Sequence, residues 1–199
     1  MKTNRRSWFA IILVIVIILI GYSYFKGMYN GMVQRSENVE QQWANVENTY
    51  QRRADLIPNL VSTVKGYAEF ERETLEAVIN ARAKATSVQV DPQNLTPEML
   101  QQFQEAQTGI SGALGRLMVV IERYPDLKAN QNFLDLQAQL EGTENRITTE
   151  RRKFNEVARD YNTFIKLFPR NIFANLFGFD ARPYFAAVEG AETAPQVEF

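Results

Sequence analysis

Three glutamates with helical spacing are the residues of this sequence whose pattern could do chemistry. Glu69, Glu73 and Glu76 stand at positions i, i+4 and i+7, so a helix would carry all three carboxylates on one face. Such a face could bind a hard cation or act as a general acid and base. However, Glu71 and Arg72 lie between them, and di-metal sites in helical bundles usually combine glutamate with histidine, which this chain lacks. We therefore expect a solvated acidic face that is neither catalytic nor metal-binding.

The missing residue types exclude most enzymatic chemistry. The 199 residues include no His and no Cys, so the chain cannot form a His general base, a thiol nucleophile, a disulfide or a zinc ribbon. Its 22 basic and 23 acidic side chains nearly balance, whereas nucleic-acid binding usually needs a basic excess. We predict a protein that is not an enzyme, binds no nucleic acid and needs no cofactor. A hydrolase that uses paired carboxylates stays as an alternative.

Two short segments mix charged, polar and apolar side chains in a way that suits protein docking. Each surrounds a proline, Pro58 in the first and Pro125 in the second, so both are predicted to be turns between helices. An up-and-down arrangement would put both turns at the same end of the molecule. Their side chains could dock a partner protein or could cap helices and close that end, and the two roles do not exclude each other. The candidate residues are Arg52, Arg53, Asp55, Asn59, Arg123, Tyr124, Asp126, Lys128 and Asn130.

The elements that must position these residues begin with an apolar segment near the N-terminus. Trp8–Phe25 spans 18 residues, about 27 Å as a helix, which is enough to cross the core of a bilayer. Lys2, Arg5 and Arg6 precede it, so the positive-inside rule predicts a cytoplasmic N-terminus at 1–7 and an outer location for the rest. A cleaved signal peptide is the alternative. Because no small-x-small cleavage pattern follows the segment, we predict an uncleaved transmembrane anchor at 8–25.

The remaining sequence has the apolar periodicity of helices. Apolar residues recur three and four positions apart, and no long stretch alternates with the period of a strand. Prolines and one polar loop mark the boundaries between helices. We predict an all-α fold, an up-and-down four-helix bundle with long helices, preceded by one N-terminal transmembrane helix. The expected helices are 28–55, 58–86, 97–124 and 127–168, in a bundle domain at 26–170.

An aromatic segment follows at 171–188, and a short acidic remainder at 189–199 is expected to be disordered. The aromatic segment is too short to span a membrane, and it carries too many large apolar side chains to be left exposed. It either packs back on the bundle or contacts the bilayer or a second subunit. The candidate contact residues are Ile172, Phe173, Leu176, Phe177 and Phe179.

The third expected helix carries three glycines at a spacing of three residues, Gly109, Gly112 and Gly115. Each costs roughly 1 kcal/mol relative to alanine inside a helix. We expect a close helix crossing, or space for a large ring such as that of Trp43, to offset this cost. A flexible hinge is the alternative.

Several motifs of the chain resemble the LemA family. They are RRADLIPNLV at 52–61, KGYA at 65–68, ERYPDLKAN at 122–130 and the aromatic run FGF at 177–179. The resemblance keeps order and spacing from about Tyr29 to Phe185. It implies a bacterial membrane-anchored protein with a four-helix up-and-down bundle. It also implies a link to membrane organisation, because a relative in magnetosome-forming bacteria takes part in building a membrane compartment.

Together these features predict a non-enzymatic scaffold or adaptor on the outer face of the cytoplasmic membrane. The expected partners are the lipid bilayer, through Trp8–Phe25, and either further copies of the chain or another envelope protein. A bundle that binds a ligand or a cation between its helices is the alternative, and the carboxylate hydrolase is a weaker one.

Overall fold

Six α-helices make up the part of the chain that the computed structural model describes, residues 5–67 and 71–186. No strand occurs in these two ranges, so the predicted all-α fold is confirmed. Glu69 and the predicted disordered tail at 189–199 lie outside the described residues. The helices are α1 (Arg5–Lys65), α2 (Arg72–Ser87), α3 (Pro97–Ile121), α4 (Pro125–Lys128), α5 (Gln131–Lys166) and α6 (Arg170–Phe177).

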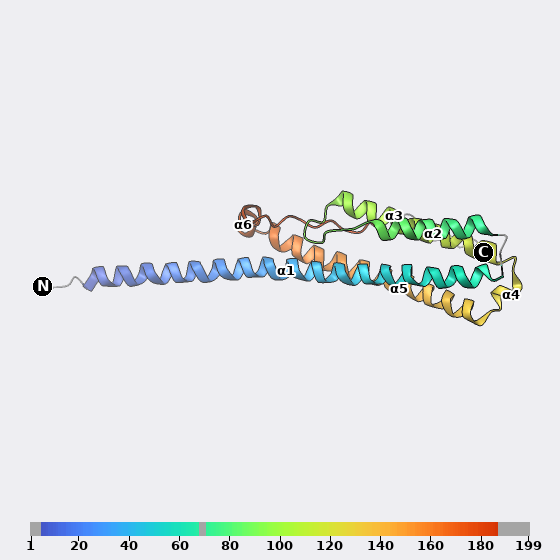
Figure 1. Cartoon of the computed structure of the whole chain (residues 1–199). Helices are drawn as coiled ribbons and strands as arrows, with labels where there is room; N and C mark the ends of the chain where they lie inside the picture. Colours follow the sequence, from blue (N-terminus) through green and yellow to red (C-terminus); the bar gives the residue numbers. More distant parts are fainter. Residues whose placement is uncertain (1–4, 68–70, 187–199) are drawn as a thin grey trace, which may run out of the picture.

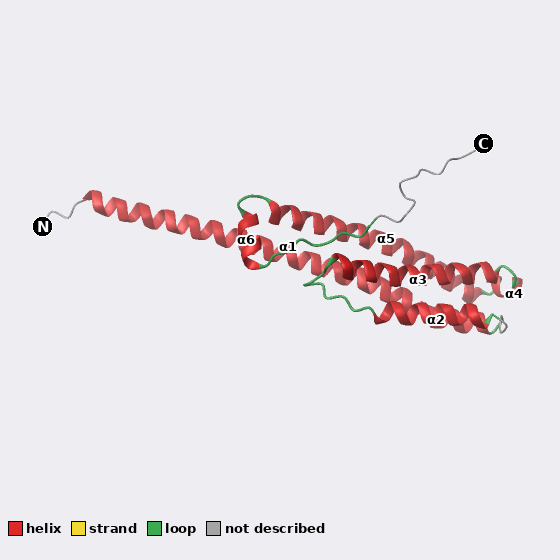
Figure 2. Cartoon of the chain, turned by 90° about the horizontal axis from the view of Figure 1, so that it is seen from above, coloured by secondary structure: helices red, strands yellow, loops and turns green. Residues whose placement is uncertain are grey.

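A single long helix, α1, is the axis of the molecule (Figure 1). Its 61 residues correspond to about 90 Å of helix. The N-terminal part of α1 projects alone, and the other helices pack along its C-terminal part (Figures 1 and 2). α5 runs back along α1, and α2 pairs with α3. The chain therefore runs out in α1, back in α2, out in α3 and back in α5, which is the predicted up-and-down bundle.

The predicted helix boundary at Pro58 is wrong, because α1 continues through this proline to Lys65. A proline lacks the N–H that would bond to the carbonyl four residues earlier, here that of Ala54. The side chain of Arg82, from α2, supplies the missing donor, with its Nε 2.8 Å from the Ala54 carbonyl oxygen. The ring of Pro58 lies on the exposed side of α1. The expected helices 28–55 and 58–86 are therefore replaced by one long helix and by α2, which begins only at Arg72.

The helix starts elsewhere follow the capping rules of the sequence. Thr96 caps α3, since its hydroxyl oxygen accepts a hydrogen bond from the Met99 N–H at 3.2 Å, and Pro97 takes the first helical position. Pro125 begins the four-residue helix α4. The cap of α5 is Asn130, whose side-chain oxygen accepts from the Phe133 N–H at 3.1 Å. The fourth predicted helix, 127–168, is therefore divided into α4 and α5.

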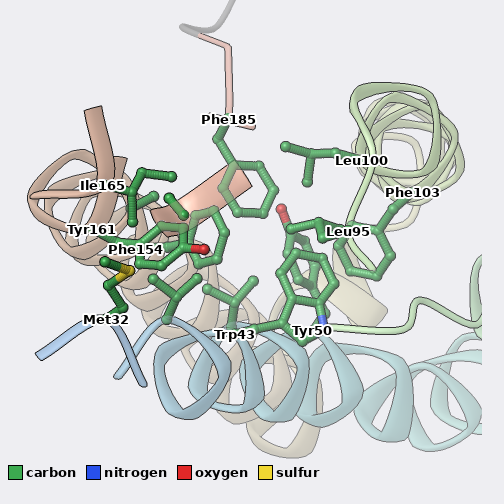
Figure 3. Packing of buried hydrophobic residues seen from close by; sticks show 14 of the residues in the cluster. Met32, Trp43, Tyr50, Leu95, Leu100, Phe103, Phe154, Tyr161, Ile165 and Phe185 are labelled. Atoms are coloured by element: carbon green, nitrogen blue, oxygen red, sulfur yellow. The ribbon is translucent and has the colours of Figure 1, made fainter. Parts of the chain in front are cut away.

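The core consists of two apolar clusters along the bundle. The distal cluster is built on Ile57, Leu117 and Phe133, far from the projecting part of α1. The proximal cluster is rich in aromatic residues and joins α1, α3, α5 and α6 with the loop before α3 and the stretch after α6 (Figure 3). Figure 3 shows Trp43 of α1 between Phe154 and Phe103, with ring centroids 5.7 Å and 5.2 Å away.

The aromatic segment packs back on the bundle and contributes to the proximal cluster. After α6 the chain runs extended beside α5 as far as Phe185, whose ring stacks on that of Trp43 at 5.9 Å between centroids. Two asparagines of α5 hold this extended stretch. Asn162 both donates to the Arg182 carbonyl and accepts from its N–H, each at 2.8 Å. Asn155 makes the same pair of bonds with the backbone of Phe185, at 2.9 Å and 2.8 Å.

The glycines of α3 do not mark a close helix crossing, so that expectation is wrong. A Cβ placed on Gly109 or Gly115 would meet nothing within 4 Å, and one on Gly112 would only reach a side-chain nitrogen of Arg116 at 4.0 Å. The close approach lies instead at Gly31 of α1. A Cβ there would stand 2.7 Å from Cζ of Phe164 in α5.

Candidate functional site

The distal end of the bundle is closed by a small polar network that includes several predicted docking residues. Glu71 accepts hydrogen bonds from the Arg123 guanidinium and from the Tyr124 hydroxyl, each at 3.0 Å. The bond to this carboxylate raises the pKa of Tyr124 above its ordinary value, because the neutral phenol is the donor. Asn130 donates to the Tyr67 hydroxyl at 2.8 Å. These contacts fit the structural alternative, in which the turn residues close the bundle end.

Other distal side chains remain accessible to a partner. Asp126 is exposed at the start of α4. Lys128 donates to Glu122 at 2.5 Å, and both side chains are more than half exposed. An exposed ion pair of this kind adds little stability and can be rearranged by a partner. The distal tip, which we define as Glu122–Asn130 together with Tyr67 and Glu71, is therefore partly structural and partly free.

The other predicted docking turn does not exist. Arg52, Asp55 and Asn59 are exposed residues within α1, and Asn59 stands about 9 Å before the end of that helix. The structure therefore does not bring them together with the distal tip. The reason is that α1 continues through Pro58, so the chain turns after Lys65 and not at 55–58.

Arg53 is the docking candidate whose environment differs most from the prediction, because its side chain is only 3% exposed. One terminal nitrogen donates to the Ser111 hydroxyl and to a Glu144 carboxylate oxygen, both at 2.9 Å. The other donates to the backbone and side-chain oxygens of Gln107 at 3.0 Å and 2.9 Å. Arg53 thus joins α1 to α3 and α5. The partners of Arg53 lie on other helices, far from it in sequence. Periodicity within one helix therefore could not predict this network.

A groove runs between α3 and α5, and Arg53 forms part of its wall. It consists of two cavities, of about 620 Å³ and 300 Å³, that share Arg53, Ser111 and Glu144 as lining residues. The larger cavity lies toward the proximal cluster and is lined by glutamine side chains of α3, by Tyr50 and by Arg151. Burial raises the pKa of Tyr50, and the guanidinium groups of Arg151 and Arg53 act in the opposite direction.

The end of the bundle beside the projecting part of α1 carries an aromatic collar, which we define as Phe25 and Tyr29 of α1 with Phe173, Phe177 and Phe179. The Phe25 ring lies 5.2 Å from that of Phe173, and the Tyr29 ring lies 5.3 Å from that of Phe177. Phe179 completes the collar at 5.8 Å from Tyr29.

The five candidate contact residues in this part of the chain divide between two sides of α6. Phe173 and Phe179 are partly buried against the proximal cluster, and Phe177 lies at the edge of the collar. Ile172 and Leu176 remain exposed, with 56% and 72% of their surface accessible. Phe168 and Leu167, which the sequence analysis did not select, are exposed beside them.

The projecting part of α1 is long and apolar enough to cross a membrane. Within the described residues it is the one helix with this property, and its apolar window is entirely unburied by the rest of the chain. Of the three glutamates of the predicted acidic face, Glu73 and Glu76 lie on α2 within the described residues. Glu76 pairs with Arg72 at 2.7 Å, and no group of three His, Cys, Asp or Glu side chains that could hold a metal ion occurs in the described part of the chain.

Comparison with known proteins identifies the family. The model of the LemA family matches residues 42–199. The chain belongs to the LemA family. Protein LemA of Metamycoplasma hominis is 26% identical, over 86% of this chain and 75% of its own length. Magnetosome protein MamQ 2 of Paramagnetospirillum magneticum is 28% identical, over 83% of this chain and 67% of its own. Magnetosome protein MamQ of Magnetospirillum gryphiswaldense is also 28% identical, over 85% of this chain and 70% of its own.

The family and the apolar helix together fit a membrane-associated protein. None of the relatives' names designates an enzymatic activity. Two of the motifs that resemble the family fall where polar contacts hold the bundle together. RRADLIPNLV at 52–61 contains Arg53 and Ala54 of α1, and ERYPDLKAN at 122–130 forms most of the distal tip.

Proposed function

We propose that this LemA-family chain is a single-pass, membrane-anchored scaffold or adaptor that works without catalysis on the outer face of the cytoplasmic membrane. The observation that carries the proposal is the continuity of α1. One helix contains both the exposed apolar segment and the inner face of the bundle, so the bundle is held rigidly on its anchor. The three basic residues before the segment favour a cytoplasmic N-terminus.

The distal tip is the surface that such a stalk would present to a partner. Forty residues of α1 separate Phe25 from Lys65, which places the tip about 60 Å from the end of the apolar segment. The exposed charges of Asp126 and of the Lys128–Glu122 pair suit a polar, reversible contact with another envelope protein or a second copy of the chain.

Isolation of the intact complex tests the proposal. The full-length chain is extracted from its native membrane in mild detergent, and the mass and composition of the complex are measured. We expect either several copies of this chain or one further protein at fixed stoichiometry. The variant Asp126→Lys should reduce that association, whereas Glu37→Lys, an equal charge reversal on an exposed part of α1, should not. A monodisperse monomer without any partner would contradict a scaffold or adaptor role.

A second candidate function is the binding of a small ligand between α3 and α5. The cavity of about 620 Å³ above Arg53 favours it, because its size suits a small molecule and its walls supply amide, hydroxyl and guanidinium groups. Native mass spectrometry of the full-length protein would detect a co-purifying molecule. Replacement of Thr108, which lines this cavity, by tryptophan should displace such a molecule without removing any contact of Arg53.

A further inference from the structure

The position of α6 along α1 coincides with the end of the apolar segment. Phe25, the last residue of that segment, contacts Phe173 and Phe177 of α6, with ring centroids 5.2 Å and 5.9 Å away. Tyr29, one helical turn further on, contacts Phe177 at 5.3 Å. If the apolar segment spans a bilayer, α6 therefore lies at the level of the lipid headgroups.

The orientation of α6 also fits a membrane surface. Figure 1 shows α6 nearly end-on beside α1, and Figure 2, turned by 90°, shows it running across the direction of α1. A helix perpendicular to a membrane-spanning helix lies parallel to the bilayer plane. Amphipathic helices that bind to membrane surfaces lie in that plane with their apolar side toward the acyl chains.

The two sides of α6 are both apolar, but only one is covered. Phe173 and Ala174 pack toward the proximal cluster. The opposite side carries Ile172 and Leu176, which are four residues apart and so share one face of the helix, and Phe168 stands in the turn just before α6. Phe168, Ile172 and Leu176 are 81%, 56% and 72% exposed, although they stand beside a well-packed aromatic collar. We call them the α6 stripe.

The charges around the stripe suit an anionic lipid surface. Lys166 and Arg170 flank it, and the residues from 166 to 179 include no acidic side chain, the next one being Asp180. Lys26 stands at the same level on α1, directly after the apolar segment. Basic side chains next to inserted apolar ones strengthen the binding of surface helices to anionic headgroups.

We propose that the α6 stripe inserts into the interfacial region of the same bilayer that α1 crosses, so that α6 is a membrane-surface helix. The proposal rests on the membrane anchoring in the proposed function and commits to lipid, since α6 contacts α1 at the end of the apolar segment and its exposed stripe is flanked by basic side chains. The bundle is then attached to the bilayer at two places, α1 and α6, and its tilt relative to the membrane is restricted. Phe173 and Phe179 position α6 and do not themselves face lipid.

The absence of cysteine from the chain gives a direct test. Single cysteines replace Ile172, Leu176, Val119 or Val16 in the full-length protein, and each is labelled with an environment-sensitive fluorophore. The proteins are reconstituted into vesicles of phosphatidylethanolamine and phosphatidylglycerol. Fluorescence is then quenched from the membrane with lipids brominated on the acyl chains, or from water with iodide. Val119, which is 73% exposed on α3, is the control for an apolar residue in water.

We expect brominated lipid to quench the labels at Ile172 and Leu176 at least about twofold, and iodide to quench them weakly, since a surface helix buries its apolar side among the acyl chains. The label at Val119 should show the reverse. Iodide quenching at Leu176 equal to that at Val119 would overturn the proposal. Protection from both quenchers, together with a disulfide between two unlabelled Leu176→Cys chains, would assign the stripe to a second copy and also overturn it.

The label at Val16, within the apolar segment, separates this proposal from the anchoring on which it rests. Lipid quenching at Val16 without quenching at Ile172 would leave the anchor intact and refute only the insertion of α6. Lack of lipid quenching at Val16 would refute the anchor itself. Because the stripe residues are exposed, their substitution should leave the helical circular dichroism and the melting temperature unchanged, which confirms that each variant is folded.

Discussion

The hydrogen bond from Arg82 to the Ala54 carbonyl should determine how well α1 tolerates Pro58. Ala54 is buried, so in the variant Arg82→Met its carbonyl would lose its partner without gaining water. A hydrogen bond from a charged donor contributes about 1.5–3 kcal/mol, and the half-exposed position of Arg82 favours the lower part of that range. We expect Arg82→Met to lower the melting temperature by about 3–6 °C, since 1 kcal/mol corresponds to about 2–4 °C in a chain of this size.

The variant Pro58→Ala restores the missing backbone donor, and this makes a double-mutant cycle possible. With an N–H at position 58, the Ala54 carbonyl keeps a partner when Arg82 is removed. We therefore expect Arg82→Met to lower the free energy of unfolding in the Pro58→Ala background by at most about half of what it does in the unmodified chain. The coupling energy between the two positions would then be about 1 kcal/mol. Urea and thermal unfolding of the full-length protein in detergent, followed by circular dichroism, measure each corner of the cycle.

The control is Arg72→Met, which lies in α2 like Arg82. Arg72 is 86% exposed and pairs with Glu76 on the surface of α2, so its replacement should lower the melting temperature much less than Arg82→Met does. Equal costs of Arg82→Met in the unmodified chain and in the Pro58→Ala variant would refute the reasoning, because the arginine would then not compensate for the proline.

Three further predictions follow from the packing. Gly109→Ala should raise the free energy of unfolding by about 1 kcal/mol, because the added Cβ would meet nothing within 4 Å. Gly31→Ala should lower the free energy of unfolding by about 1–3 kcal/mol, because its Cβ would clash with the ring of Phe164. Thermal unfolding compares the two variants. Asn162→Ala should cost about 2–3 kcal/mol and speed proteolysis after α6, because it leaves the buried backbone of Arg182 unpaired. Burial raises the pKa of Tyr161 above 10.0, so the stability it contributes is present below pH 10 and lost at higher pH. Tyr161→Phe should therefore weaken the fall in the free energy of unfolding as the pH rises above about 10.

The periodicity of apolar residues predicted the helical fold because burial on one side of a helix is a local requirement. Apolar residues that recur with helical spacing, such as Trp43 of α1 and Phe154 of α5, are buried. The predicted start of a helix at 97 was also correct, since the cap at Thr96 depends on a few adjacent residues. The boundary at Pro58 was wrong because the group that compensates for the proline, Arg82, is far away in sequence and reaches it only in the folded bundle.

The candidate site was predicted only in part, for the same reason. Sequence reasoning selected Arg53 as a docking residue, but its partners Gln107 and Glu144 come from two other helices and bury it. It selected Tyr124 at the distal tip, but not the part of Glu71 in holding it. The groove between α3 and α5 depends on the separation of those helices, and no pattern within either helix encodes it.

By itself, the sequence determined the properties that depend on composition and on neighbouring residues. These are the apolar segment at 8–25, the helical class, the lack of His and Cys chemistry, and the aromatic character of the C-terminal segment. The tertiary structure alone decided which polar groups meet and which apolar side chains stay uncovered. Folding buried Phe185 against Trp43 and left Leu176 exposed, although the two lie in the same aromatic segment. The physical reason is that burial and hydrogen bonding are satisfied between elements, so the outcome for each residue depends on the packing of the whole bundle.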